Sequence, residues 1–296
     1  MCFMPKVSAA ILTYNRRNCV LKAIESVYEQ ETIQSTEIVV VDSASSDGTA
    51  DAIATQFPAV KLIRLPQNLG CPGGRNHLYA NCSGDYIVNL DDDGCLCEGN
   101  LRGVAEIFDA HPDVGVISMP RVETEGCAGK GKPLEGLVET SSFSGGLSAF
   151  RREMLNKVGN YPEHYFLIAE EAHLALRIID AGYRIVYAPN LPMRHPAEAV
   201  NSGDVKWDFY RFRNQLLVVL ELFPAWLCRK YVLLRLGSYL VISVRRGTIL
   251  SYLHAVADIG LRWPAIMRRR KPVSPNAVHK YLQLRDNEML CDGNSE

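Results

Sequence analysis

The sequence predicts an α/β fold with a mostly parallel central sheet flanked by helices, followed by a C-terminal amphipathic helical region. Apolar strand segments alternate with helical segments four times between residues 7 and 94, the pattern of a sheet with helices on both faces. Residues 206–271 differ, because they hold thirteen Lys and Arg against three Asp and Glu, a net charge of +10. This leaves −11 for the rest of a chain whose total is −1, an acidic body with a basic appendage.

The first four predicted strands are short and rich in aliphatic and β-branched residues. They cover residues 7–12, 37–41, 60–65 and 86–90. After the first strand, Val20, Ile24 and Val27 recur at helical spacing, and a turn rich in capping residues after the second opens a helix through Ile53. A glycine-rich loop at 66–76 opens the third helix. Ligands of such sheets bind at the carboxyl ends of the strands, so we expect the four loops there to share a site.

The middle of the chain continues the alternation. A helix begins at Glu170 and Glu171, with Leu174 and Ile178 in its buried stripe, and ends at Gly182. The other expected elements are a helix at 100–110 and strands at 114–119 and 184–187. Residues 205 to about 270 are predicted to be helical, and the chain from about Pro275 to be a loose terminus with one short helix.

Composition indicates a cytoplasmic globular protein. Nine cysteines lie scattered without the spacing of a disulfide framework, which suits a reducing compartment. Cys95 and Cys97 have no second pair to complete a zinc site, and we interpret them as incidental. The N-terminus lacks the apolar core of a signal peptide, and no uncharged apolar run is long enough for a spanning helix. No nucleic-acid-binding motif accompanies the basic tail, and the acidic body argues against such a partner.

Three consecutive acids, Asp91, Asp92 and Asp93, follow the fourth strand. Like charges repel, and a hard divalent cation with oxygen ligands would supply the counter-charge. Asp91 and Asp93, one residue apart, would both turn towards such an ion. The alternative is a polar turn that ends in Gly94.

The other loops carry groups that suit a nucleotide. Asp42 would accept from a base or ribose donor, and Arg16 and Arg75 would meet a base carbonyl or a diphosphate. Ordinary helix capping also explains Asp42, and ordinary turns explain the glycines near Arg75. A Rossmann fingerprint and a Walker A lysine are both missing from the sequence.

Four segments together resemble the nucleotide half of the family 2 glycosyltransferases, which have the GT-A fold and invert the anomeric centre. They are VSAAILTYN (7–15), EIVVVDSASSDGT (37–49), NLG (68–70) and LDDD (90–93). FSGGLSAFRR (143–152) and the aromatic-Arg-Asn segment FYRFRNQ (209–215) extend the resemblance. It implies that Asp91 and Asp93 form a D-x-D motif that holds ribose and Mn²⁺ or Mg²⁺ beneath a diphosphate. The implied nucleotide-binding residues are Thr13, Asn15, Arg16, Asp42, Asn68, Arg75 and Asp91.

The resemblance also assigns a general base to the helix that begins at Glu170. Acids at a helix N-terminus stabilise it through the macrodipole, which is the structural explanation. The family usually has Glu-Asp at 170 and 171, so Glu171 would be the base, with Glu170 beside it. Glu stands here where Asp is usual, and His173 where another Asp is common, which leaves the geometry of the base open. The family often carries a histidine near the metal, and His195 is the matching candidate ligand.

We therefore expect a GT-A catalytic domain at 1–200, with a nucleotide-binding half (1–95) and an acceptor half (96–200), and a helical region at 201–296. It would move a sugar, with inversion, from a nucleoside diphosphate sugar to a hydroxyl of a carbohydrate, lipid-linked or small-molecule acceptor in polysaccharide, glycolipid or natural-product synthesis. Two alternatives remain: a non-catalytic sugar-nucleotide or membrane-binding module, and a phosphatase of haloacid dehalogenase type with Asp91 as nucleophile. The basic tail would either contact an anionic membrane peripherally, on its inner face, or pack as a solvated subdomain.

Overall fold

The computed structural model describes residues 7–31, 35–123, 132–196 and 205–292. Its main sheet has eight strands in the order β3-β2-β1-β4-β9-β6-β10-β8. Strands β9 and β8 run against the other six, which are parallel to one another, so the predicted mostly parallel sheet is confirmed. The strands are β1 (Val7–Thr13), β2 (Thr36–Asp42), β3 (Lys61–Arg64), β4 (Tyr86–Asp91), β6 (Val114–Ser118), β8 (Val138–Glu139), β9 (Leu147–Arg151) and β10 (Arg184–Tyr187).

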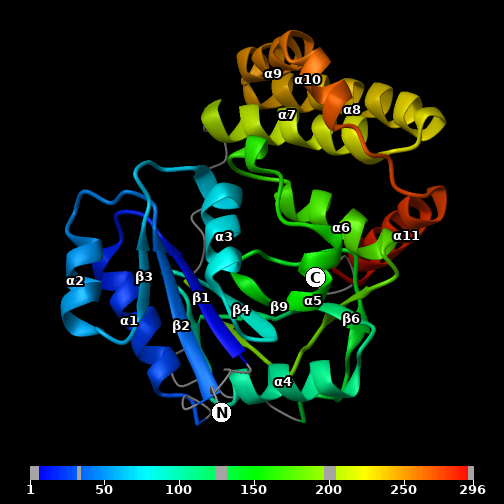
Figure 1. The fold of residues 1–296 in the computed structure, drawn as a ribbon. Helices are drawn as coiled ribbons and strands as arrows, with labels where there is room; N and C mark the ends of the chain where they lie inside the picture. Colours follow the sequence, from blue (N-terminus) through cyan, green and yellow to red (C-terminus); the bar gives the residue numbers. More distant parts are fainter. Residues whose placement is uncertain (1–6, 32–34, 124–131, 197–204, 293–296) are drawn as a thin grey trace.

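Helices cover both faces of this sheet (Figure 1). Alternate residues of β1 show why: Ile11 belongs to the buried cluster that includes α1 and α4 on one face, whereas Ala10 belongs to the cluster that includes α3, α5 and α6 on the other. Successive side chains of a strand point to opposite faces, so a strand that is apolar throughout is buried on both. The flanking helices are α1 (Arg17–Tyr28), α2 (Thr49–Gln56), α3 (Gly70–Asn81), α4 (Asn100–Ala110), α5 (Arg152–Val158) and α6 (Glu170–Asp180).

A small second sheet places residues 193–195 beside the acidic turn at 91–93, although the two segments are far apart in the sequence. It consists of β5 (Cys95–Leu96), β11 (Met193–Arg194) and β7 (Arg121–Val122), with β11 in the centre. In β11, Arg194 pairs with Cys95, two residues beyond Asp93, so the next residue, His195, emerges beside that turn.

The predicted helical tail is present and consists of five helices. They are α7 (Val205–Leu222), α8 (Ala225–Arg246), α9 (Ile249–Leu261), α10 (Trp263–Arg269) and α11 (Pro275–Asp292). The expectation of a loose terminus with one short helix is wrong, because α11 has 18 residues and packs against α6, with Ala277 and Val278 buried. Its Glu288 accepts hydrogen bonds from Ser141 N–H (2.5 Å) and Ser142 Oγ (3.1 Å). Contacts with the sheet domain that are distant in sequence decide this, and the local sequence did not reveal them.

The apolar core continues from the sheet domain into the tail. Leu174 of α6, Leu217 and Leu220 of α7, and Val278 of α11 belong to one buried cluster. The boundary at residue 200 stays a prediction, and residues 197–204 around it lie outside the described part. Among the described helices, none is long and apolar enough to cross a bilayer. Cys97 is disulfide-bonded, a pairing that the cysteine spacing did not predict.

Candidate active site

The carboxyl ends of the central strands bring the predicted site residues to one edge of the sheet. Thr13 at the end of β1 pairs in register with Asp42 at the end of β2, and Leu12 pairs with Asp91 at the end of β4. The expectation that these loops share an edge is therefore confirmed. The parallel register explains it, since each strand ends at the same level of the sheet.

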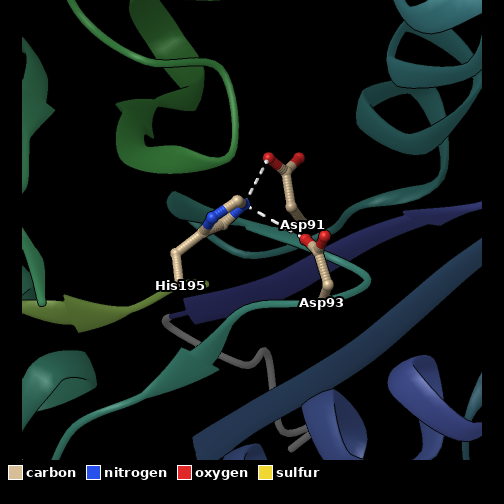
Figure 2. A group of neighbouring side chains, drawn as sticks. All are labelled: Asp91, Asp93 and His195. Atoms are coloured by element: carbon tan, nitrogen blue, oxygen red, sulfur yellow. Dashed lines mark ion pairs between the residues drawn. The ribbon is translucent and has the colours of Figure 1, made fainter. Parts of the chain in front are cut away.

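Asp91, Asp93 and His195 form a compact group of potential metal ligands (Figure 2). One ligand atom from each lies within 4.8 Å of the others. His195 Nε2 is 3.4 Å from Asp91 Oδ2 and 3.1 Å from Asp93 Oδ1. The acidic turn is closed by the Gly94 N–H, which donates to the Asp91 carbonyl at 2.9 Å. Among the described residues, this is the group of three ligand-type side chains that could hold an ion.

The electrostatics of this group are those of a cation site. Hydrogen bonds to Asp91 and Asp93 raise the pKa of His195 to about 10. Burial raises the pKa of Asp91, but the bond from His195 and the charge of Arg75 outweigh it and leave the pKa below its ordinary value. The imidazolium thus occupies the place of a positive charge between two carboxylates. Two carboxylate oxygens and an imidazole nitrogen are also a donor set that Mn²⁺ accepts, so the residues fit the implied ion.

Asp92 points away from this group and braces the loop after β1. Thr13 Oγ1 donates to Asp92 Oδ2 at 2.9 Å, and Arg16 Nη1 lies 3.3 Å from Asp92 Oδ1. Arg16 also pairs with Asp93. Burial raises the pKa of Asp92 to about 6. Two of the predicted nucleotide-binding residues, Thr13 and Arg16, are therefore tied to the acidic turn, a connection that the sequence did not reveal.

Asp42 and Asn15 lie where the loops after β1 and β2 meet. Asp42 is 2% exposed; its Oδ2 accepts from the Ser45 N–H at 3.0 Å, whereas its Oδ1 has no hydrogen-bond partner. A buried carboxylate oxygen without a hydrogen-bond partner, at the edge of the sheet where ligands bind, can accept a hydrogen bond from a ligand. Asn15 joins the two loops, because its N–H donates to Ser45 Oγ and its Oδ1 accepts from the Ser46 N–H, both at 2.8 Å.

Arg75 connects the acidic turn to the helix that begins at Glu170. Its side chain is 7% exposed; Nη2 donates to Asp91 Oδ1 at 3.0 Å, and Nη1 lies 3.6 Å from Glu171 Oε1. The backbone of Gly145 and Gly146 covers this bridge. A Cβ on Gly145 would lie 1.8 Å from Arg75 Nη1, and one on Gly146 would lie 1.9 Å from Asp91 Cγ. Only glycine leaves room there, and the sequence did not show this contact.

Asn68 shapes the turn that starts α3. Its Oδ1 accepts from the Gly70 N–H at 2.8 Å, and Gly70 has a φ of +74°. A Cβ on Gly70 would collide with the Phe166 carbonyl oxygen at 2.3 Å, so the turn packs directly on the loop before Glu170. The structure thus gives Asn68 a bracing role at the helix that carries Arg75.

Glu170 and Glu171 occupy different surroundings although they are neighbours. Glu170 is 2% exposed, its Oε2 has no hydrogen-bond partner, and burial followed by the charge of Glu171 raises its pKa. Burial also raises the pKa of Glu171, while Arg75 opposes the rise. The Glu171 side chain is 27% exposed, so it is the one of the two that a molecule from solvent can reach.

The loop that precedes Glu170 has a strained backbone, and side chains of α7 donate hydrogen bonds to its carbonyl groups. Phe166, Ile168 and Ala169 have φ values of 65°, 68° and 67°, a left-handed conformation that side chains disfavour. Asn214 is fully buried and its Nδ2 contacts three carbonyls of this loop; Arg213 adds two more contacts. The acceptor carbonyls are those of Tyr165 (3.1 Å), Leu167 (2.6 Å) and Ile168 (2.8 Å) for Asn214, and of His164 (3.1 Å) and Tyr165 (2.9 Å) for Arg213. The sequence shows the aromatic-Arg-Asn segment at 209–215, but its contacts with this loop were not predicted from it.

Comparison with known proteins agrees with this geometry. The O-antigen chain rhamnosyltransferase WbaN of Salmonella anatum is 25% identical over 211 residues, 65% of this chain and 66% of the relative. A Campylobacter jejuni protein, GalNAc(5)-diNAcBac-PP-undecaprenol beta-1,3-glucosyltransferase, is 33% identical over 117 residues, 36% of this chain and 38% of the relative. The chain thus spans less than two thirds of the length of these relatives.

Solved structures establish the fold. Mannosyltransferase PcManGT from Pyrobaculum calidifontis, in complex with GDP-Man and Mn²⁺, matches with a TM-score of 0.59 and 24% identity, over 88% of this chain and 76% of that one. TarS 1-349 of S. aureus with UDP-GlcNAc matches with a TM-score of 0.61 and 18% identity, over 86% and 80%. The predicted GT-A fold is confirmed. The family model for glycosyl transferase family 2 matches residues 8–167, more than half of the sequence, and the chain belongs to that family.

Proposed function

We propose that the protein transfers a hexose, with inversion, from a nucleoside diphosphate sugar to an acceptor hydroxyl. The observation that carries this proposal is the bridge at the edge of the sheet, where buried Arg75 joins the Asp91, Asp93 and His195 group to Glu171. A cation site and a carboxylate base in fixed relation are what a single displacement at an anomeric carbon requires. Family membership supports the same activity.

The donor nucleotide would bind across the loops after β1 and β2. The unpaired Asp42 Oδ1 supports this, because a base or ribose donor would satisfy it. Thr13, Asn15 and Asn68 would line this site, held by the hydrogen bonds described above. Arg16, which pairs with Asp93, would face the diphosphate. Neighbouring structures hold GDP-Man and UDP-GlcNAc, which leaves both a purine and a pyrimidine donor consistent with the fold.

Asp91, Asp93 and His195 would hold Mn²⁺ or Mg²⁺. Such an ion offsets the charge that develops on a departing diphosphate. The residues contribute the rest: Arg75 keeps Asp91 ionised and oriented, and Arg16 offers a second positive group to the same phosphate region. His195 would bind in its neutral form, with Nδ1 facing the Pro196 carbonyl at 3.0 Å and Nε2 facing the carboxylates.

Glu171 would act as the general base. Its carboxylate takes the proton from the acceptor hydroxyl while that oxygen forms the bond to the anomeric carbon and the bond to the diphosphate breaks. One displacement from the face opposite the leaving group inverts the centre. Glu170 is buried behind Glu171 and acts through it, because the negative charge of either residue raises the proton affinity of the other.

The acceptor is proposed to be a carbohydrate on a lipid-linked or polysaccharide carrier. The name of the Campylobacter jejuni relative states an undecaprenol-linked acceptor, and that of the Salmonella anatum relative an O-antigen chain. Such an acceptor would place the protein in the cytoplasm at the inner face of a membrane.

A panel of nucleoside diphosphate sugars, assayed for released nucleoside diphosphate with and without Mn²⁺ and acceptor glycans, tests the proposal. Metal-dependent release with one donor supports it, and an anomeric product analysis decides between inversion and retention. A protein that binds donors but releases nothing with any donor and acceptor would be a non-catalytic binding module. A burst of phosphate from an aryl phosphate would indicate phosphatase chemistry, which the family assignment argues against.

A further inference from the structure

Helix α8 exposes a stripe of large apolar side chains that the fold leaves uncovered. Trp226, Leu233, Leu240 and Val244 follow one another at intervals of seven, seven and four residues, which places them on one face of the helix. Leu233 is 71% exposed and Val244 is 64% exposed. Trp226 lies beside His279 of α11, with ring centroids 6.2 Å apart, and Leu233, Leu240 and Val244 do not belong to the core clusters. A continuous exposed apolar face of this kind marks an interaction surface.

Helix α9 and the start of α10 also expose large apolar side chains. Leu250 and Leu253 on α9 are 65% and 51% exposed, and the turn between α9 and α10 presents Leu261 (84%) and Trp263 (46%). These helices lie at the end of the molecule that is remote from the strands β1 and β2 (Figure 1). The surface formed by these residues and the α8 stripe is called the tail surface below.

Positive charge surrounds the tail surface. Residues 225–271 hold ten Lys and Arg and a single acid, Asp258, a net charge of +9. Arg229, Lys230, Arg245 and Arg268 are exposed, and none of them makes an ion pair with a residue in the described part of the chain. They are free to meet an external anion.

Neighbouring arginines are occupied in the fold. Arg246 lies 3.5 Å from Asp208, Arg269 lies 3.2 Å from Glu221, and Arg270 donates to the Phe223 carbonyl at 2.6 Å. Of the three arginines at 268–270, only Arg268 is therefore exposed without an ion pair in the described part of the chain. Only part of the basic tail contributes to the tail surface.

We propose that the tail surface docks the protein on a bilayer with anionic headgroups. Apolar side chains on one face, basic residues along it and two tryptophans are the features of a helix that lies in the membrane interface. The +9 charge selects an anionic surface over a neutral one and disfavours a second copy of the chain, because two such faces would repel. The proposal rests on the proposed function in one respect, since a lipid-linked acceptor would lie at that surface.

The tail surface is rigidly connected to the acceptor side of the site. Phe212 of α7 packs on Tyr252 of α9, with ring centroids 6.2 Å apart, and two residues further along α7 Asn214 holds the loop before Glu170. Docking by α8 and α9 would thus hold the Glu171 side of the site in a defined relation to the bilayer.

Sedimentation with vesicles of phosphatidylglycerol and phosphatidylcholine tests the proposal. Exposed charges interact over about 30 Å at ~0.01 M salt and about 3 Å at ~1 M, so binding should weaken at least about tenfold between these conditions. Binding to phosphatidylcholine alone should be weaker by at least about tenfold at low salt. Trp226 and Trp263 are two of the three tryptophans, so the fluorescence should shift to the blue on binding.

Two sets of substitutions and a control locate the contact. Exposed residues are chosen so that the fold is retained. The charge set is Arg229→Gln, Lys230→Gln, Arg245→Gln and Arg268→Gln; the apolar set is Leu233→Ser, Val244→Ser and Leu261→Ser; the control is Arg64→Gln and Arg102→Gln on the sheet domain. Either of the first two sets should lower vesicle binding at least about tenfold, whereas the control should not change it.

Wild-type protein that stays in the supernatant at low salt, or binds neutral vesicles as strongly as anionic ones, overturns the proposal. Dimerisation without lipid, abolished by the apolar set, overturns it in favour of a second copy. Release of nucleoside diphosphate is measured in parallel. Donor turnover without vesicle binding refutes the tail surface alone, and vesicle binding without turnover of any donor refutes the proposed function alone.

Discussion

Asn214→Ala tests whether the helical tail positions Glu171, the proposed general base. Asn214 is fully buried; its amide N–H groups face three carbonyls of the loop before Glu170, and its Oδ1 accepts from Arg213 Nε at 2.8 Å. The amide has two N–H donors, so these contacts amount to about three hydrogen bonds, two donated and one accepted. At about 0.5–1.5 kcal/mol net for each, their loss should lower the free energy of unfolding by roughly 1.5–4.5 kcal/mol.

The functional effect follows from the strain in the loop. Phe166, Ile168 and Ala169 are non-glycine residues in the left-handed region, each of which costs about 1–3 kcal/mol when nothing compensates it. Without Asn214 the loop should relax and move the start of α6. A displacement of about 1 Å can cost roughly 10²-fold in rate, so kcat for sugar transfer should fall by about 10–100-fold. Donor affinity should change little, because Asn214 lies behind the loop.

The assay separates positioning from loss of stability. Urea unfolding gives the free energy, titration with donor and Mn²⁺ gives its Kd, and saturating transfer gives kcat. Leu220→Ala is the matched control, because Leu220 lies in the core on the same helix and its truncation costs about 2–5 kcal/mol, while Asn214 and Arg213 make the hydrogen bonds to the loop. Asn214→Asp, which cannot donate to the carbonyls, should be worse than Asn214→Ala. If Asn214→Ala and Leu220→Ala both keep wild-type kcat, the positioning role is refuted.

The remaining predictions concern the site itself. Asp93→Asn should abolish metal-dependent donor binding, measured by calorimetry with and without Mn²⁺, and full activity after chelation would contradict the metal site. The thermal midpoint without metal should fall modestly, because Asn lacks the anion that pairs with Arg16 and His195. Glu171→Gln should lower kcat ~10²–10⁴-fold with donor Kd unchanged. If Glu171→Gln transfers sugar normally and Glu170→Gln is inactive, Glu170 is the general base instead. Gly146→Ala should displace the Asp91 carboxylate and weaken donor binding, whereas Gly237→Ala, with open space around its Cβ, should not.

Local patterns in the sequence determined the fold class and most of the chemistry. The four apolar strands, the loops that follow them and the acids at 91 and 93 were predicted from spacing and residue type, and the sheet and its ligand edge agree. The role expected of the acids at 170 and 171 came from the family resemblance. Such features can be read because strand and helix periods are properties of neighbouring residues, and parallel strands bring their carboxyl ends together wherever they occur. The roles of individual site residues stay predictions.

Tertiary contacts decided what each polar group faces. The pairing of β11 with β5 brings His195 to Asp93, and burial turns Arg75 towards both Asp91 and Glu171. Tertiary contacts also distinguish the residues of the tail. Arg269 pairs with Glu221 and Arg270 donates to the Phe223 carbonyl, whereas Arg268 is exposed. Asn214 donates to the loop before Glu170. The physical reason is that burial and pairing join residues far apart in the chain. Their partners depend on the packed fold, and residue type or local spacing carries no information about them.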